Sequence, residues 1–570
     1  MRVALDHASS VANDESSSEA RKGNGTQSLA FGVSAGGTAQ RLGRRALGML
    51  FAFAFVLRLA HVLAMTDSPY FNNPIIDAQE YERIGAAIAR GAGHPENVFW
   101  HPPAYPYFLG AVWAVSRGSY LAPRLMQALF GAFVVVLTAW IGARTFRQRV
   151  GLVAGMGAAL CGTLLYYDAE LLAASVGVFF VMASVALALL AAEHGRRLLW
   201  TAAGLVGGLG ALTVASSIVV PLIVAVFARR RSVWVVLGLA LALAPATLHN
   251  RRQGGEWVLI SSNGGVNLSI GNNPNYEQMV SVRPDKNWLR LVQEPEQFGI
   301  YSPAAKSSYF VRKAVSWAVH EPAAFARLQL HKMKLLVSGD EIFRNQAIYP
   351  ARQYSPILRA LLWKIPGLAF PFGVLMPLAA VGLWLGARQA PLLVALVGGL
   401  AATVLMFFVT SRYRVPLLPF LLIFAAYAAI WSIEKATNKQ RVVAVLAAAT
   451  VFLLSNVGLG AMDRKMNADA EYALAMRLGE RGNMQQAMAL FESAVASRPD
   501  YAEAWLNLSA CYESFGRATD ARAAVAKAYR LDAPFTVAAL RDFSRTGKPE
   551  LAQRLARYLR EAVGGSVIGI

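Results

Sequence analysis

Long apolar runs separated by short polar segments occupy most of the chain, up to about residue 460. The first run, Ala46–Met65, is about 20 residues long, enough to cross the hydrocarbon core of a bilayer. No convincing small-residue cleavage site follows it, so we read it as a retained span and not as a signal peptide. Ten further runs fall near residues 121–141, 150–167, 171–192, 198–213, 215–228, 233–248, 368–386, 391–409, 415–432 and 441–460. The pattern predicts an all-α polytopic membrane protein with about 11 transmembrane helices.

Basic residues between the runs predict the orientation, because cytoplasmic loops are enriched in Lys and Arg. They form five clusters after the first span: Arg144, Arg147 and Arg149; Arg196 and Arg197; Arg229 to Arg231; Arg388; and Lys435, Lys439 and Arg441. All five are cytoplasmic if the short apolar segment Ala104–Val115 does not cross the membrane. The N-terminus is then inside and the C-terminus outside. Residues 66–120, the turn 167–170, residues 249–360, the turn 410–414 and the C-terminal tail share the outer face.

Composition agrees with a membrane protein and excludes several other classes. Hydrophobic residues make up 55% of the chain and charged residues only 16%, which is too apolar for a soluble enzyme. The net charge of +21 is explained by cytoplasmic loops, so we expect no nucleic-acid partner. Cys161 and Cys511 are too few for a disulfide framework or a cysteine-based zinc site. The sequence has no Walker motif or dinucleotide fingerprint.

The chain divides into three parts. Residues 1–40 are rich in Ser, Gly and Asn and predict a disordered cytoplasmic N-terminus. Residues 41–462 form the membrane domain, with outer loops 66–120 and 249–360. Residues 463–570 form a separate soluble helical module.

This module contains an internal repeat. Residues 468–501 and 502–535 are consecutive 34-residue units with matching residues, namely Leu474 with Leu508, Gly482 with Gly516, Ala487 with Ala521, and Ala494 with Ala528. The period is typical of tetratricopeptide repeats, which are stacks of helix pairs. We expect residues 536–562 to form a capping helix pair and the concave groove to bind a peptide or a protein partner.

The first outer loop has an acidic segment, IIDAQEYERIGAAIARG, that predicts a helix from about Ala78 to Arg90. Asp77 and Glu80 have the spacing of a helix capping box, which is a structural interpretation. The alternative is that they are chemical groups of an active site. His101 follows in HPPAYPYF, where two prolines would hold it at the membrane boundary; a solvated interfacial histidine is the simpler alternative.

Two polar turns interrupt the apolar runs. Asp168 and Glu170 lie in YYDAE, between two apolar runs, and ionisable residues near the membrane boundary are costly and usually face a cavity. Arg412, Tyr413 and Arg414 lie in SRYRVPLLP, where paired guanidinium groups can bind phosphate oxygens. Helix capping by the acids and snorkelling by the arginines are the structural alternatives.

The long outer segment begins HNRRQGGEW, with Asn250 and Arg251, and continues SSNGGVNLSIGNNP, which contains Asn272. Its glycines allow the backbone to approach a ligand, so the run is a candidate cradle for a sugar or diphosphate. A turn between two strands is an equally good interpretation of the same letters.

In this order, the motifs IIDAQEY, HPPAYPYF, PRLMQALFGA, LLYYDAE, SSNGGVNLSIGNNP and SRYRVPLLP resemble the GT-C membrane glycosyltransferases, in particular protein O-mannosyltransferases and lipid A aminoarabinose transferases. The resemblance covers residues 45 to 460. It implies a GT-C-type helical bundle, a polyprenyl-phosphate-linked sugar donor and an acceptor reached from the outer face. Asp77 corresponds to the family's first-loop acid. The family often has Asp-Glu there, whereas Ala78 follows here, which leaves open whether Glu80 or Asp168 shares the role.

The resemblance implies an inverting hexosyltransferase of a bacterial inner membrane, with the C-terminal repeats in the periplasm. Asp77 and Asp168 are the expected catalytic residues, and Glu80, His101, Glu170, Asn250, Arg251, Asn272, Arg412, Tyr413 and Arg414 the expected substrate-binding residues. The acceptor is a protein or a glycan. No ligand spacing requires a metal, although a divalent ion is compatible with the carboxylates. The alternatives are a lipid-linked glycan ligase or polymerase, and a non-catalytic membrane-anchored repeat scaffold. A transporter is disfavoured because the carboxylates cluster at one face.

Overall fold

The computed structural model describes residues 42–280, 286–344, 348–460, 463–545 and 549–563, so the predicted disordered segment 1–40 lies outside the described residues. The chain forms two compact units. The first comprises Met1–Asp67, Tyr81–Ile342 and Ile348–Leu459; the second comprises Ser68–Glu80, Phe343–Ala347 and Gly460–Ile570. The sequence predicted a single boundary between residues 462 and 463. The second unit also includes part of the first loop, because side chains of that loop pack on the repeats.

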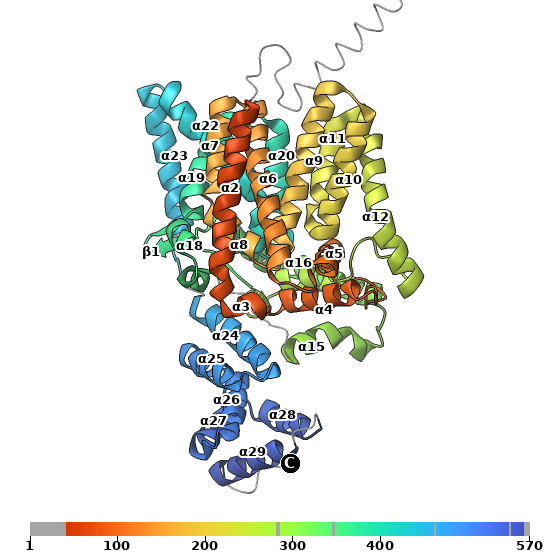
Figure 1. The fold of residues 1–570 in the computed structure, drawn as a ribbon, viewed down its shortest axis with the longest axis vertical. Helices are drawn as coiled ribbons and strands as arrows, with labels where there is room; N and C mark the ends of the chain where they lie inside the picture. Colours follow the sequence, from red (N-terminus) through yellow and green to blue (C-terminus); the bar gives the residue numbers. More distant parts are fainter. Residues whose placement is uncertain (1–41, 281–285, 345–347, 461–462, 546–548, 564–570) are drawn as a thin grey trace, which may run out of the picture. The chain divides into compact units, whose positions relative to one another are not determined.

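The first unit is a bundle of apolar helices (Figure 1). The helices of the bundle are α2 (Arg44–Ala64), α6 (Leu121–Thr145), α7 (Gln148–Ala159), α8 (Gly162–Ala169), α9 (Ala174–His194), α10 (Arg197–Thr213), α11 (Val219–Ala228), α12 (Ser232–Gly254), α19 (Phe372–Gly386), α20 (Pro391–Met406), α22 (Leu418–Glu434) and α23 (Asn438–Asn456). Each of the 11 predicted runs contains a helix. The run predicted from residue 368 differs at its start, where residues 368–370 are a strand.

Five helical segments of the described chain are by themselves long and apolar enough to cross a membrane, or six if α7 and α8, bent by 50°, form one span. The five are Arg44–Asp67, Leu121–Thr145, Ala174–His194, Ala215–Gly254 and Ser411–Glu434. Helices α19 and α20 are apolar but shorter. The all-α membrane fold is thus confirmed, and the number of 11 crossings stays a prediction.

Other elements connect the bundle helices. They are α5 (Ala104–Ser116), α13 (Gly264–Gly271), α14 (Tyr276–Val280), α15 (Lys286–Gln293), α16 (Pro303–His320), α17 (Pro322–Val337), α18 (Pro356–Leu361), α21 (Ser411–Arg414), and the antiparallel strands β1 (Trp363–Ile365) and β2 (Leu368–Phe370). Helix α4 (Asp77–Ala89) begins in the second unit and continues in the first. The Asn- and Gly-rich run after residue 260 is helix α13, so the interpretation as a turn between strands was wrong.

Small residues allow the bundle helices to approach closely. Gly204 of α10 and Gly238 of α12 face each other's helix, and a Cβ at either would overlap a backbone carbonyl, of Val235 or Thr201 respectively. Close backbone approach through small residues is a common packing mode of membrane helices. It explains why α12 packs along α10 over much of its length.

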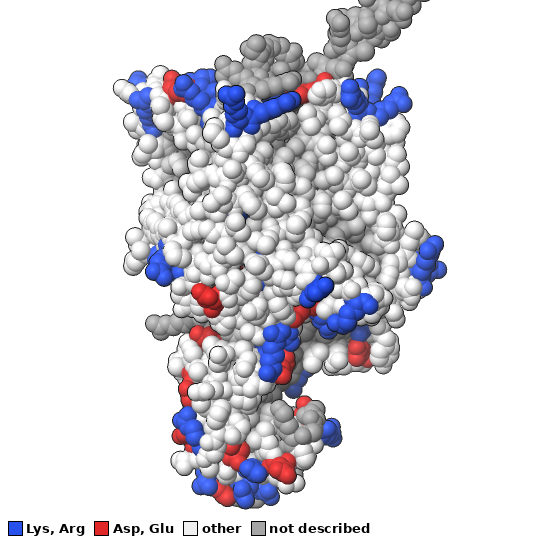
Figure 2. Space-filling view, viewed as in Figure 1, with Lys and Arg blue, Asp and Glu red and all other residues white. Residues whose placement is uncertain are grey.

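Contacts bring most of the predicted cytoplasmic basic clusters to one end of the bundle, here called the basic end. Arg144 pairs with Glu193, Arg149 pairs with Glu434 at 2.7 Å, and Arg231 donates to the carbonyl of Gly195. Figure 2 shows Lys and Arg gathered along one edge of this unit, followed by a band of surface without charges. The clusters thus share one end of the bundle, and their assignment to the cytoplasmic side stays a prediction.

The second unit contains three helix pairs. They are α24 (Asp463–Glu480) with α25 (Met484–Ser497), α26 (Ala502–Ser514) with α27 (Ala518–Leu531), and α28 (Ala533–Arg545) with α29 (Pro549–Val563). The equivalent residues Ala487 and Ala521 are both fully buried, and so are Ala494 and Ala528. The repeat and the capping pair predicted from the sequence are confirmed. The short helix α3 (Pro69–Asn72) also belongs to this unit.

Candidate functional site

A buried polar layer, defined by Arg58, Arg124, Gln127, Asp168 and Ser175, lies at the end of the bundle opposite the basic end. Arg124 and Arg144 are 20 residues apart on the same helix α6, which separates them by about 30 Å. The predicted acid Asp168 contacts a basic side chain, that of Arg58, in this layer.

The centre of the layer is an ion pair. Nε of Arg58 donates to Oδ2 of Asp168 at 2.7 Å, and their side chains are 0% and 5% exposed. Oδ1 of Asp168 accepts from the hydroxyl of Ser175. Removing charges from water is costly, and this pair offsets the cost with charge-assisted hydrogen bonds. Both carboxylate oxygens of Asp168 are therefore already in use.

Gly131 of α6 makes room for this pair. A Cβ at that position would overlap Oδ2 of Asp168 and Nε of Arg58. The glycine thus permits three helices, α2, α6 and α8, to bring their backbones together around one ion pair. A small cavity beside the pair is lined by Arg58, Gly131, Val134, Leu164, Tyr167, Asp168, Ser175, Val178 and Val415.

Arg124 and Gln127 hold the backbone of the YYDAE turn. Nε of Arg124 donates to the carbonyl of Ala169 at 2.6 Å, and Nε2 of Gln127 donates to the carbonyls of Asp168 and Glu170 at 3.1 and 2.6 Å. Helix α8 ends here, so these carbonyls have no helical partners of their own. The side chain of Glu170 is 5% exposed.

Tyr105 extends the layer toward His101. Its hydroxyl donates to Oε1 of Gln127 at 2.7 Å, and burial raises the pKa of Tyr105 well above its ordinary value, so the phenol stays a donor. The ring of Tyr81 lies edge-on to the rings of both Tyr105 and His101, with centroids 5.1 and 5.4 Å apart. His101 is half-buried and lies 3.4 Å from Nδ2 of Asn263.

Arg414 is buried and holds neighbouring segments through hydrogen bonds. It is 1% exposed and donates to the carbonyl of Ser338 at 2.6 Å, to the carbonyl of Asp340, and to Oε2 of Glu341 at 3.4 Å. Glu341 in turn accepts from the hydroxyl of Thr163 at the start of α8. Arg414 therefore connects the SRYR motif to the helix that carries Asp168.

Arg412 differs from Arg414 in exposure. Its guanidinium is partly exposed, lies 5.1 Å from the ring centre of Tyr413, and donates to the Tyr413 hydroxyl at 3.3 Å. The two arginines expected to act as one fork thus have different surroundings. Of the two, Arg412 has the guanidinium that solvent reaches.

Asn250 and Arg251 also differ. Asn250 is fully buried and bonds only to backbone in the contacts observed: it accepts from the N–H of Phe99 at 2.9 Å and donates to the carbonyls of Val258 and Ile260. Arg251 is exposed, with its guanidinium 5.4 Å from the ring centre of Trp257. Asn250 holds the segment before His101 in place.

Asn272 is held by Lys332. Nδ2 of Asn272 donates to the carbonyls of Leu268 and Met406, and its Oδ1 accepts from Lys332 Nζ at 3.1 Å. Lys332 Nζ also donates to the carbonyls of Gly271 and Phe407, at 3.0 and 3.1 Å. Burial lowers the pKa of Lys332 to about 8. These bonds link α13 and α17 to the end of α20, just before the SRYR motif.

Asp77 and Glu80 lie in the second unit. Asp77 is the first residue of α4, one residue earlier than predicted, and both side chains are half-buried. The preceding residue, Ile76, has φ +57°, a backbone region that a β-branched side chain rarely adopts. The helix start at Asp77 is thus sharply defined.

Sequence reasoning missed Arg58, Arg124, Gln127 and Glu341. Arg58, Arg124 and Gln127 are polar residues inside long apolar runs, and such a residue is by itself a signal of a functional or pairing role. Glu341 lies in the polar stretch SGDEI and gives no comparable signal. Among the described residues, no group of three or more His, Cys, Asp or Glu side chains is arranged to hold a metal ion.

Two parts of the chain match known families. Residues 100–249 match the family described as dolichyl-phosphate-mannose-protein mannosyltransferase, and residues 480–540 match the tetratricopeptide repeat. None of the curated proteins matches the chain. The resemblance predicted from the motifs is confirmed over these residues: the chain is a helical membrane protein similar to glycosyltransferases, with a C-terminal repeat module.

Solved structures of low identity were also found. One is the archaeal oligosaccharyltransferase AglB from Archaeoglobus fulgidus in complex with an inhibitory peptide and a dolichol-phosphate, at 13% identity and a TM-score of 0.38, over 72% of this chain and 55% of that one. Another is the Archaeoglobus fulgidus oligosaccharyltransferase in complex with Zn and sulfate, at 13% identity and a TM-score of 0.41, over 72% and 52%. The chain thus spans little more than half the length of these proteins.

Proposed function

We propose that this protein is an integral membrane glycosyltransferase that transfers a sugar from a polyprenyl-phosphate-linked donor to an acceptor at the outer face, with inversion of the anomeric carbon. The lipid carrier agrees with the name of the family matched by residues 100–249. We place the enzyme in a bacterial inner membrane, with the basic end cytoplasmic and the repeats periplasmic. The acceptor is a protein or a glycan.

One observation carries the proposal: three motifs of the resemblance meet through buried polar contacts. Arg124 of PRLMQALFGA holds the backbone of YYDAE, and Arg414 of SRYRVP reaches the same helix α8 through Glu341 and Thr163. Buried charges are costly in a membrane protein and are usually kept for function. A repeat scaffold that only needs an anchor has no use for such a layer.

Asp77 is the general base in this proposal. Its carboxylate takes the proton of the acceptor hydroxyl while the acceptor oxygen forms a bond to the anomeric carbon. The bond between that carbon and the phosphate oxygen breaks on the opposite face, and the lipid phosphate leaves with the electron pair. A positioned base contributes about 10²–10⁴ in rate.

Arg412 receives the leaving phosphate. Its partly exposed guanidinium suits a ligand, whereas Arg414 is buried against carbonyl groups and positions the motif. Tyr413 orients the Arg412 guanidinium through the contact between them. Preorganised donors of this kind stabilise charge that develops in the transition state.

The other candidates position these groups. Asp168, already paired with Arg58, holds α8 against α2 and α6, and Glu170 shares that turn. His101, Arg251 and Glu80 contact sugar or acceptor hydroxyls. Asn250 and Asn272 hold the loops that carry them.

The test uses the full-length protein in membranes with a panel of radiolabelled polyprenyl-phosphate sugars and an acceptor extract. Wild type is expected to transfer label from one donor, and Asp77→Asn to transfer at least 100-fold less. Asp67→Asn, an exposed acid ten residues earlier, is the matched control and should keep full transfer. If wild type transfers label from none of the donors, the proposed activity is rejected. If Asp77→Asn keeps full transfer, the role of Asp77 as general base is rejected.

A further inference from the structure

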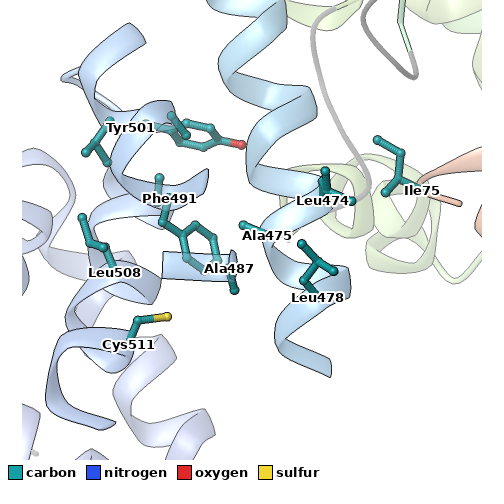
Figure 3. Close-up of a cluster of buried hydrophobic side chains, with 12 residues drawn as sticks. Ile75, Leu474, Ala475, Leu478, Ala487, Phe491, Tyr501, Leu508 and Cys511 are labelled. Carbon is teal, nitrogen blue, oxygen red and sulfur yellow. The ribbon is translucent and has the colours of Figure 1, made fainter. Parts of the chain in front are cut away.

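The repeat module packs directly on the loop segment that leads into Asp77. Ile75 is 2% exposed and belongs to the same apolar cluster as Leu474 and Leu478 of α24. Figure 3 shows Ile75 next to Leu474, at the edge of the cluster that continues through Phe491 to Leu508. A loop residue is therefore part of the core of the repeats.

The guanidinium of Arg481 also holds this segment, through hydrogen bonds. Arg481, in the turn after α24, donates from one nitrogen to the carbonyl of Asn72 at 2.6 Å and to Oδ1 of Asn73 at 2.9 Å. Asn73 also donates to the carbonyl of Pro69 at 2.8 Å, so its side chain joins the repeat module to the short helix α3. Backbone and side chain of the loop are both held.

These contacts act on the backbone immediately before Asp77. The amide of Ala78 donates to the carbonyl of Ile75, and the amide of Glu80 donates to the carbonyl of Ile76, at 3.1 Å each. The positive φ of Ile76 is unfavourable for a β-branched residue, and surrounding contacts must offset the strain. Partial burial of Ile76 against the repeat core supplies such contacts. The start of α4 thus depends on the anchored segment.

We infer that the tetratricopeptide module positions Asp77 for the transfer reaction, by holding residues 68–76 through Ile75 and Arg481. This inference rests on the proposed function, in which Asp77 is the base. Ile75 and Arg481 are positioning residues, since they act on Asp77 through the backbone. Loss of the module would then lower transfer even where no partner protein is needed.

The first measurement is amide hydrogen exchange of residues 68–80 in the full-length protein in nanodiscs. Ile75→Ala and Arg481→Ala are expected to raise exchange in this segment at least tenfold. Arg517→Ala is the matched control, because Arg517 is an exposed arginine of the second repeat whose ion pairs, with Glu492 and Asp520, stay within the repeats. Unchanged exchange in both variants would overturn the inference, whatever the activity.

The second measurement separates kcat from KM. Ile75→Ala and Arg481→Ala should lower kcat at least tenfold with the KM for the donor unchanged, and Arg481→Lys should restore part of it. Raised exchange with wild-type kcat would overturn the positioning role. Neither substitution removes a contact between two helices of the repeats, since Ile75 belongs to the loop and Arg481 is exposed. Full transfer by Asp77→Asn would reject the base itself, while the exchange result still decides whether the module holds the loop.

Discussion

Nε of Arg58 in α2 lies 2.7 Å from Oδ2 of Asp168 in α8, although the two residues are 110 positions apart in the chain. Both are buried among mostly apolar helices. Neither has an alternative partner of opposite charge in the observed contacts of the layer. Their pairing therefore joins α2 to α8 by a buried ionic contact.

We predict that Arg58→Ala lowers the free energy of unfolding by about 3–5 kcal/mol, because it leaves a buried carboxylate without its cation. Replacing both residues by Leu should cost less than the sum of the single changes, since no charge is then stranded. Thermal unfolding in detergent measures this. Arg149→Ala, in an exposed pair, is the control and should cost at most about 1 kcal/mol. Additive effects at residues 58 and 168 would contradict the coupling.

Gly131→Ala should destabilise the protein by about 1–3 kcal/mol, because the added methyl group overlaps the ion pair and forces it to shift. Gly398→Ala in α20 is the matched control. No atom lies within 4 Å of its added Cβ, so alanine there should be neutral or stabilising by up to about 1 kcal/mol. Equal melting temperatures of the two variants would show that the close approach at Gly131 is not required.

Arg412→Ala should lower activity, whereas Arg414→Ala should lower stability. Arg412→Ala is expected to lower kcat about 10²–10³-fold with little change in melting temperature, as for loss of a transition-state donor. Arg414→Ala should lower the melting temperature, since it leaves two carbonyls without this donor and the buried Glu341 without this cation. Kinetics and thermal unfolding of both variants decide this. A folded Arg412→Ala variant with wild-type kcat would show that Arg412 does not bind the leaving phosphate.

We predict that the free energy of unfolding rises with pH because of Lys332. Its pKa is about 8 in the folded protein and 10.5 in the unfolded chain, so between these values the unfolded state binds more protons. The cost of burying the ammonium is fully present below pH 8 and is lost as the pH rises toward 10.5. Stability relative to Lys332→Met should increase by about 2 kcal/mol between pH 7.5 and 9.5.

The control for this measurement is Lys334→Met on the same helix α17, where the side chain is exposed. It should follow the wild-type pH profile. A profile of Lys332→Met that matches wild type across the same range would show that Lys332 is charged at little cost in the folded protein.

Local sequence patterns were enough to predict the helices, the repeats and the common end of the basic clusters. These features depend on local quantities: the length of an apolar run sets whether a helix can span a bilayer, and a 34-residue period sets the helix pairs of the repeats. Asp168 and Glu170 were also found this way, because an acid between two apolar runs is visible without knowing its neighbours.

The role of each polar side chain depends instead on contacts between segments that are far apart in the chain. Arg412 and Arg414 look equivalent in SRYR, yet Arg414 is buried by carbonyls about 75 residues away in the chain, and Arg412 is not. Asn272 is held by Met406, 134 residues later, and the loop before Asp77 by Arg481, 409 residues after Asn72. The transfer free energy of a single residue is enough to predict whether it is buried. The hydrogen-bond partners of a buried residue depend on which segments of the chain meet, and packing of the whole chain determines which segments meet.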